Sequence, residues 1–333
     1  MRYIGSKSSS IEEIFKCVAA YTTEGTFCDP FGGTSTVGSY FKQRGFQVFT
    51  GDLLHFAHFI QIAKLNFSEQ SELEPLRTKL GLDEVPKIKE YFNSLPTKHG
   101  WFVANFALDR SFFSEINAAK IEACWSEIIR LKTKNLIDYN EYAFLMASLI
   151  ESMDRVANTA GTYYAYLKNL SIKASRDFRF ELIIPVSGDF LGHSKLGDAL
   201  DLIKERHYDI IYLDPPYNDR RYHGYYHLPE ALARGIKPVV KGKAGVCKFD
   251  LEIPSDFYST NSAVNSLNNI LENANFNMLL FHYCSDGLIP QEKLDEVFAK
   301  YELTAKIDVF SLGYSTKKIK RESSTILYMI RNE

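Results

Sequence analysis

The sequence predicts an α/β protein whose sheet is interrupted by a helical segment, and three observations lead to this prediction. A strand, a glycine turn, a helix and a second strand follow one another over residues 26–52, which is typical of neighbouring parallel strands. Helical periodicity replaces the strand signals over residues 67–180. Apolar, strand-like runs return from residue 181. We therefore predict one α/β domain made of residues 1–66 and 181–333, with a helical domain, residues 67–180, inserted into it.

The elements before the insert are short and well marked. The first strand is expected at residues 26–28, where a short apolar stretch ends at Asp29. A turn with two glycines follows at residues 30–34, and a helix over residues 36–44 is stopped by Gly45. Residues 46–50 (FQVFT) favour a second strand, which leads into Asp52. Two carboxylates therefore stand at the ends of two predicted strands.

The insert and the segment after it differ in pattern. Apolar residues recur at helical spacing over residues 116–131 and 142–153. After the insert, residues 181–185 are apolar and favour a strand, and residues 196–206 favour a short helix. Further buried strands are expected at residues 209–213, 277–283 and 325–330. The first of these three leads directly into Asp214.

The composition is that of a globular protein. Of the 333 residues, 45% are hydrophobic and 24% are charged, which excludes a disordered chain, a collagen and a coiled coil. The net charge of −2 argues against a general polyanion binder, although local patches can differ from the total. Aromatic residues reach 14%, and they can fill a core or stack on bases.

Cysteine and histidine spacing predicts no metal site. The five cysteines are far apart and form no CxxC pair, so we expect free thiols in a reducing compartment. The histidines lack spacings such as HExxH. No signal segment and no apolar run of about 18 residues is found, so we expect a cytoplasmic protein without membrane contact.

The glycine turn favours a ligand with a nucleoside part. Ligands of open parallel sheets bind beyond the carboxyl ends of the strands, and Gly32 and Gly33 allow the backbone to approach one closely. The turn is neither a P-loop nor a GxGxxG motif. Asp52, at the end of the next strand, suits a ribose diol. An ordinary tight turn is the alternative for the glycines taken alone.

The second motif follows the buried strand at residues 209–213. Two prolines fix the backbone and remove two amide donors, so the Pro215 carbonyl keeps one direction. Together with the adjacent carboxylate it offers two acceptors, which match the two hydrogens of an exocyclic amine, and an aromatic ring could stack on the base. A cis-Pro turn with a capping Asp is the alternative. The motif is Asp214-Pro215-Pro216-Tyr217.

Taken in this order, the two motifs resemble those of DNA adenine-N6 methyltransferases, in the Dam-like class where the glycine loop precedes the DPPY motif. Residues 2–7 (RYIGSK) and 27–33 (FCDPFGG) resemble the family's cofactor motifs. The resemblance implies a Rossmann-like class I methyltransferase sheet, S-adenosylmethionine as cofactor, and an inserted target-recognition domain. One departure lies in the loop, where Ser35 belongs to a stretch (FGGTS) without the second spaced glycine of some relatives.

The resemblance assigns roles to individual residues. Asp214, Pro215, Pro216 and Tyr217 would be catalytic, with an ionised Asp214 and the Pro215 carbonyl holding the amine. Lys7 would meet the cofactor carboxylate, Tyr3 would pack near the cofactor, and Asp198 would contact its adenine or, equally, begin a helix. The full set of expected cofactor contacts is Tyr3, Lys7, Asp29, Pro30, Phe31, Gly32, Gly33, Asp52, Leu53, Asp198 and Asp214.

The implied substrate is double-stranded DNA. The target base must leave the stack, and phosphate contacts must help to offset that cost. Residues 220–248 contain seven basic side chains and one acid, Glu230, and a second basic cluster covers residues 317–321. The DNA contacts expected are Arg220, Arg221, Tyr222, Lys241, Lys243, Lys317 and Lys318. A solvated charged surface is the alternative for both clusters.

The activity implied is methyl transfer to adenine N6 in a restriction–modification or related system, where a cognate endonuclease would act without direct contact. Cytosine-N4 methylation is chemically close and is the nearest alternative, although there Ser more often takes the place of Asp214. A noncatalytic DNA-binding protein is a further alternative. A nicotinamide dehydrogenase would need GxGxxG, and a cytosine-C5 enzyme would need a cysteine nucleophile beside a proline; neither is found.

Overall fold

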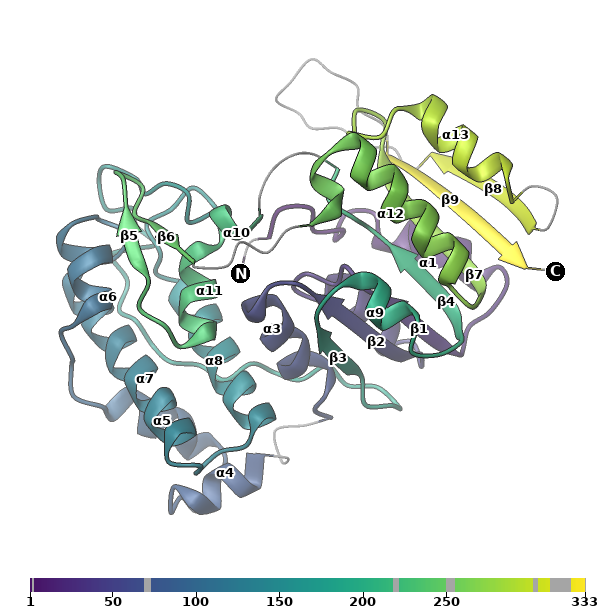
Figure 1. Ribbon diagram of the computed structural model, residues 1–333. Helices are drawn as coiled ribbons and strands as arrows, with labels where there is room; N and C mark the ends of the chain where they lie inside the picture. Colours follow the sequence, from purple (N-terminus) through teal and green to yellow (C-terminus); the bar gives the residue numbers. More distant parts are fainter. Residues whose placement is uncertain are drawn as a thin grey trace. The chain divides into compact units, whose positions relative to one another are not determined.

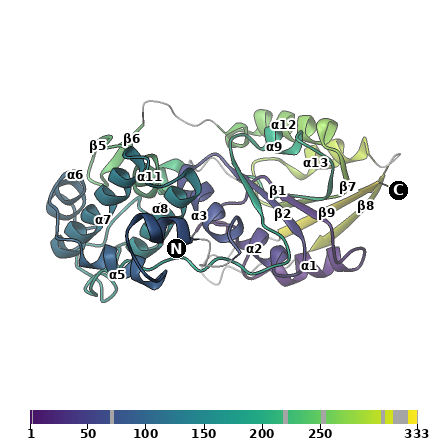
Figure 2. The ribbon, with the colours of Figure 1, turned by 90° about the horizontal axis from the view of Figure 1, so that it is seen from below.

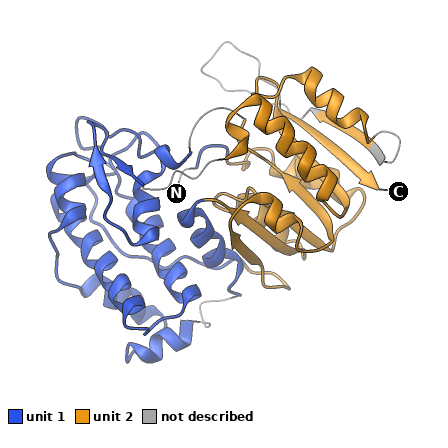
Figure 3. Ribbon diagram, in the orientation of Figure 1, with its two compact units in different colours: residues 1–5, 54–186, 222–252 blue, residues 6–53, 187–221, 253–333 orange. Residues whose placement is uncertain are grey.

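The computed structural model of the protein describes residues 1, 3–68, 73–217, 222–249, 255–301, 305–311 and 325–332. The chain forms two compact units, which Figure 3 colours separately. Unit 1 comprises Met1–Gly5, Leu54–Val186 and Tyr222–Glu252, and unit 2 comprises Ser6–Leu53, Ser187–Arg221 and Ile253–Glu333.

Unit 2 contains a mostly parallel sheet, with the strand order β3-β2-β1-β4-β7-β9-β8 in the described ranges (Figure 1). The strands from β3 to β7 pair in parallel, whereas β9 is antiparallel to both β7 and β8. The order reverses between β1 and β4, where ligands of such sheets bind. The strands are β1 (Thr26–Asp29), β2 (Gln47–Asp52), β3 (His193–Leu196), β4 (Tyr208–Leu213), β7 (Phe276–Cys284), β8 (Ala305–Ser311) and β9 (Thr325–Asn332).

Helices cover both faces of this sheet, as Figure 2 shows. One face carries α9 (Ala199–Ile203), α12 (Thr260–Asn273) and α13 (Gln291–Ala299), and the short η3 (Asp256–Tyr258) precedes α12. The other face carries α1 (Ile11–Ala19) and α2 (Thr36–Lys42). Burial of apolar side chains on both faces is the main force that holds the layers together.

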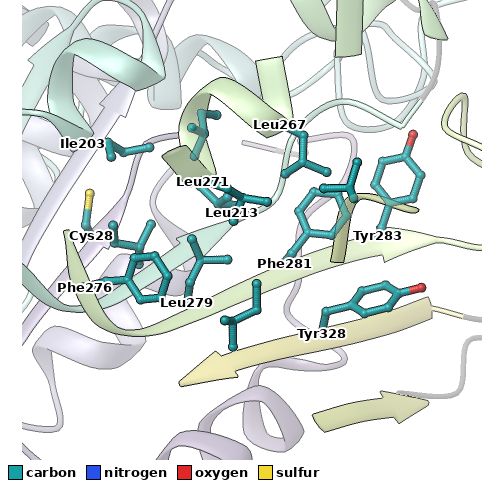
Figure 4. Close-up of a cluster of buried hydrophobic side chains, with 14 of the residues drawn as sticks. Cys28, Ile203, Leu213, Leu267, Leu271, Phe276, Leu279, Phe281, Tyr283 and Tyr328 are labelled. Carbon is teal, nitrogen blue, oxygen red and sulfur yellow. The ribbon is translucent and has the colours of Figure 1, made fainter. Parts of the chain in front are cut away.

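The core under α9, α12 and α13 is formed by side chains that alternate along the strands. Leu213, Leu279 and Phe281 point to this face and meet Leu267 and Leu271 of α12 (Figure 4). On the opposite face Phe27 of β1 stacks on Phe41 of α2, with ring centroids 3.8 Å apart. Because strand residues alternate between faces, the central strands β4 and β7 carry apolar side chains on both sides and read as nearly continuous buried runs.

Unit 1 is largely helical, and its two long helices begin with side-chain caps. The Ser114 Oγ accepts a hydrogen bond from the Asn117 amide, and Asp138 forms a capping box with Glu141. The elements are α3 (His55–Leu65), α4 (Glu74–Lys79), α5 (Pro86–Ser94), α6 (Trp101–Val103), the π-helix η2 (Ala104–Leu108), α7 (Glu115–Thr133), α8 (Tyr139–Asp154), α10 (Tyr222–Tyr225), α11 (His227–Arg234) and the hairpin strands β5 (Val239–Lys241) and β6 (Val246–Lys248).

The predicted α/β fold with a parallel sheet is confirmed, and five predicted strands correspond to β1, β2, β4, β7 and β9. The strand predicted at residues 181–185 is wrong. Its backbone is bonded to side chains instead: the Glu181 amide donates to Ser152 Oγ and the Ile183 amide to Ser148 Oγ. Both hydroxyls belong to α8, so the segment packs along a helix without joining the sheet.

The compact units differ in extent from the predicted domains. Residues 54–66 and 222–252 were assigned to the catalytic domain by sequence, but they belong to unit 1 with the helices. The reason is packing within unit 1: the indole of Trp125 donates to the Leu232 carbonyl, and the Tyr142 hydroxyl donates to the Ala233 carbonyl. None of the helices in the described ranges is both long and apolar enough to cross a membrane.

Candidate active site

The candidate site lies in unit 2, at the carboxyl ends of the two central strands. β1 ends at Asp29 and β4 ends at Leu213, and the strands are paired with Cys28 opposite Ile211. Asp29 and Asp214 therefore follow neighbouring strands at the point where the strand order reverses. Asp52 ends β2, the strand on the other side of β1. The sheet thus brings the three predicted carboxylates to one edge.

The glycine turn is held by Asp52. The Gly33 amide donates to Asp52 Oδ2 at 3.1 Å, and the Gly32 amide donates to the Gly51 carbonyl at 2.9 Å. Gly33 has a φ of +50°, in the left-handed region that glycine adopts without strain. The predicted ribose acid therefore also shapes the loop, which the spacing alone did not indicate.

The departure at Ser35 has a structural consequence. Ser35, the residue before α2, has φ 58° and ψ 41°, which is left-handed backbone that a serine adopts at a cost. Its side chain is fully buried, and the Oγ has no hydrogen-bond partner among the described residues. A Cβ at Gly38, one turn into α2, would come within 2.9 Å of that Oγ. The loop is therefore tightly packed around a residue that glycine would suit better.

Asp29 is a buried carboxyl with an unused acceptor. It is 2% exposed, and its Oδ1 has no hydrogen-bond partner in the described part of the chain. Burial, and then the nearby charge of Asp214, raises the pKa of Asp29 well above its usual value. An unpartnered buried oxygen of this kind is costly, so the site fits a ligand that brings a donor or a positive charge.

The carboxylate of Asp214 has a partner on each oxygen. Lys7 Nζ lies 2.7 Å from Asp214 Oδ2, and the Tyr217 hydroxyl donates to Asp214 Oδ1. Lys7 Nζ also donates to the Tyr217 hydroxyl at 2.6 Å, which closes the group. The Lys7 and Asp214 side chains are only 9% and 14% exposed. Lys7 thus contacts both ends of the Asp214–Tyr217 motif.

Tyr217 is fixed from both its ring and its backbone. Its carbonyl accepts from the Leu288 amide at 2.8 Å, and its ring meets Tyr283 edge-on with centroids 5.3 Å apart. Lys7 Nζ lies 4.7 Å from the centre of the Tyr217 ring. A base that stacks on the face covered by Lys7 therefore requires the lysine side chain to move.

Beside this group lies a buried pair that the sequence analysis missed. The Tyr212 hydroxyl and His282 Nδ1 are 2.6 Å apart, and both side chains are fully buried. Burial lowers the pKa of His282 to about 4, although the Asp214 charge acts in the opposite direction. The only sequence signal was a polar residue in the otherwise apolar run NMLLFHY.

The other cofactor contacts predicted from the sequence lie on several different elements of unit 2. Asp198 caps α9, where its Oδ1 accepts from the Leu200 amide at 2.9 Å, and it is exposed. Pro30 and Pro215 are buried, Pro216 and Leu53 are partly buried, and Phe31 packs edge-on against Phe257. These side chains all belong to unit 2.

Tyr3 and the predicted DNA contacts fall elsewhere. Tyr3 belongs to unit 1, where its ring stacks on Tyr226 with centroids 5.0 Å apart and meets Tyr222 at 5.9 Å. Lys241 and Lys243 are exposed at the turn of the β5–β6 hairpin. The remaining predicted contacts lie outside the described residues: Arg220, Arg221, Lys317 and Lys318.

Comparison with known proteins agrees with this arrangement of motifs. The sequence model of the D12 class N6 adenine-specific DNA methyltransferases matches residues 3–283. The chain therefore belongs to this family. It is 31% identical over 324 residues to the type II methyltransferase M.NlaIII of Neisseria lactamica, covering 94% of this chain and 91% of that protein.

Two further relatives are much longer than this chain. It is 29% identical over 329 residues to the type II methyltransferase M.FokI of Planomicrobium okeanokoites, and 29% identical over 331 residues to the modification methylase StsI of Streptococcus sanguinis. Each match covers 97% of this chain but 50% of the relative. The chain therefore spans about half the length of these two proteins.

Proposed function

We propose that this chain transfers a methyl group from S-adenosylmethionine to the N6 amine of an adenine in double-stranded DNA, as the modification enzyme of a restriction–modification system. The observation that carries the proposal is the position of Asp214 and its two prolines. They follow the central strand β4, beside the glycine loop and Asp29 that follow β1. Membership of the D12 family and the names of its relatives support the same activity.

The site residues fit the cofactor. The unpartnered Oδ1 of buried Asp29 offers an acceptor for a cationic or donor group of the ligand. Gly32 and Gly33 leave space for close approach, and Asp52 suits a ribose diol. When bound, S-adenosylmethionine supplies an electrophilic methyl group without a metal ion. The residues proposed to hold it are Lys7, Asp29, Pro30, Phe31, Gly32, Gly33, Asp52, Leu53, Asp198 and Asp214, with Tyr3 nearby.

Asp214 and the Pro215 carbonyl accept the two hydrogens of the adenine amine. These bonds favour tetrahedral nitrogen and localise its lone pair, which otherwise delocalises into the ring. They also lie in place for the positive charge that grows on the nitrogen during transfer. The product can lose its proton to solvent or to Asp214.

Both Asp214 oxygens are already bonded, so the amine has to share the carboxylate with Lys7 and Tyr217 or replace one of them. Lys7 is the one to leave, since a cation beside the amine opposes the charge that develops there. The cofactor carboxylate offers Lys7 an alternative anion. We therefore propose that Lys7 would pair with the cofactor carboxylate, which would leave that Asp214 oxygen and the face of Tyr217 open to the base.

The base has to leave the duplex, which costs a few kcal/mol, and stacking on Tyr217 returns about 1–3 kcal/mol. Phosphate contacts must supply the remainder. The exposed Lys241 and Lys243 are suited to this task, because no acid occurs between Glu230 and Lys248. Arg220, Arg221, Tyr222, Lys317 and Lys318 complete the proposed set of DNA contacts.

The test is to incubate the chain with radiolabelled S-adenosylmethionine and duplex DNA, and to identify the labelled nucleoside. We expect label on adenine, incorporated far more slowly by the Asp214→Ala variant, which is the matched control. Label on cytosine would overturn the adenine assignment and select N4 methylation. No label under any condition, with DNA still bound, would select a noncatalytic DNA-binding protein.

A further inference from the structure

His282 is placed at the level of the catalytic motif by the pairing of two strands. β7 runs parallel to β4, with Phe281 opposite Leu213. His282 follows Phe281 on β7, and Asp214 follows Leu213 at the end of β4, so the two residues lie at the same level. Phe281 points into the core under α12 and α13, so His282 points to the opposite face. There it meets Tyr212, which precedes Leu213 on β4.

The hydrogen bond between Tyr212 and His282 defines which ring nitrogen carries the proton. In the described residues, the Tyr212 hydroxyl has one hydrogen-bond partner, His282 Nδ1, at 2.6 Å. A buried phenol needs an acceptor for its hydrogen, and burial keeps that phenol protonated by raising the pKa of Tyr212. Tyr212 therefore donates to Nδ1, and the neutral ring carries its hydrogen on Nε2.

That Nε2–H has no acceptor among the described residues, although the side chain is fully buried. The charged groups around it are those of the site: Asp214 and Lys7 both act on the imidazole electrostatically. Its ring also lies 6.5 Å from the Tyr217 ring, between centroids. A buried donor without a partner costs free energy. This cost is accounted for if the donor forms a hydrogen bond once the site is occupied.

We propose that His282 is a positioning residue for methyl transfer: its ring, oriented by Tyr212, presents the Nε2–H donor to the corner formed by Asp214 and Tyr217. Once Lys7 leaves Asp214, this donor keeps the corner in the geometry that receives the amine. A neutral donor suits this task better than a cation, because it holds the carboxylate without opposing the charge on the amine. The proposal rests on the adenine methyltransferase activity proposed above.

The test compares single-turnover methylation by three variants under saturating cofactor and DNA. His282→Leu and His282→Asn lose the Nε2 donor, and we expect the rate to fall at least about tenfold, with dissociation constants for cofactor and DNA within about twofold of wild type. His282→Gln carries an amide nitrogen near the position of Nε2, and we expect a rate within about threefold of wild type.

Two further variants separate positioning from packing. Met278→Ala removes a buried side chain from the same face of β7, and it should lower stability while leaving the rate within about twofold of wild type. Tyr212→Phe removes only the hydroxyl that orients the ring, so it should slow transfer several-fold in a fully folded protein. If the His282 variants fail to fold, the rate of Tyr212→Phe alone tests the positioning role of His282.

Each outcome decides the question. A His282→Leu variant as fast as wild type, or a His282→Gln variant as slow as His282→Leu, would overturn the proposal, and so would an unchanged rate in Tyr212→Phe. These failures are distinct from failure of the proposed function, in which the wild-type chain itself would label no adenine.

Discussion

Replacing Ser35 with glycine should stabilise unit 2, because the native backbone at this position suits glycine better than serine. Among the described residues only Ser35 and Asn135 combine a side chain with positive φ. Asparagine tolerates this conformation, whereas serine does so less readily. Ser35 also buries an Oγ that has no hydrogen-bond partner there. Two separate costs therefore fall on one residue.

The magnitudes can be separated with two variants. Left-handed backbone costs an L-residue about 1–2 kcal/mol, and a buried unsatisfied hydroxyl costs about 1–3 kcal/mol. Glycine adds about 0.5–1 kcal/mol of entropy to the unfolded chain, which opposes the gain. Ser35→Ala removes the hydroxyl and keeps the strain, whereas Ser35→Gly removes both. We expect Ser35→Gly to exceed Ser35→Ala in stability by about 0.5–1 kcal/mol and wild type by about 1.5–4 kcal/mol.

The assay has to report on unit 2. Both tryptophans, Trp101 and Trp125, belong to unit 1, so their fluorescence would follow the wrong part of the chain. Hydrogen exchange of the β1 and β2 amides under urea, measured by mass spectrometry, follows the sheet beside Ser35. A Ser35→Gly variant that is no more stable than Ser35→Ala would refute the strain argument. A Ser35→Gly variant that is less stable than wild type would refute both costs assigned to Ser35, the backbone strain and the buried hydroxyl.

Three other predictions concern catalysis, binding and pH. Asp214→Ala should bind cofactor and DNA yet transfer methyl on the order of a thousandfold more slowly in single-turnover assays, and near-normal turnover would contradict the mechanism. Tyr217→Ala should weaken binding about tenfold more for a paired target than for one opposite a gap, and equal losses in titrations would remove the stacking role. Burial lowers the pKa of His58, His227 and His282 to about 4, so between about pH 6.5 and 4 the unfolded chain holds protons that the folded chain lacks. The free energy of unfolding should therefore decrease as the pH is lowered through this window, by up to about 1.4 kcal/mol per pH unit for each histidine. The raised pKa of the buried Asp29 carboxyl acts in the opposite direction. Urea titrations in which the free energy of unfolding does not decrease would contradict this prediction.

The sequence was informative where local pattern and chemistry coincide. Asp29, Asp52 and Asp214 each follow an apolar, strand-forming run, so their positions at one sheet edge could be predicted without an alignment. The strand β3 could not be found this way. Three of its four residues (HSKL) are polar and all four are at least partly exposed at the sheet edge, so no apolar run marks it.

Contacts between distant segments were beyond the sequence. Residues 181–185 have an apolar pattern but are bonded to hydroxyls of α8, and nothing local distinguishes such a segment from a strand. Lys7 could be placed in a motif, but its bond to Asp214 depends on how the chain folds back. His282 could not be singled out from the sequence, because its partner Tyr212 lies on another strand.

The most direct test of the account is a crystal structure with S-adenosylhomocysteine and a duplex that contains the target adenine. We expect the extruded amine to lie against Asp214 and the Pro215 carbonyl, with the ligand's sulfur facing it and Lys7 no longer bonded to Asp214. A ligand whose sulfur is walled off from Asp214, with the lysine still in place, would contradict the account.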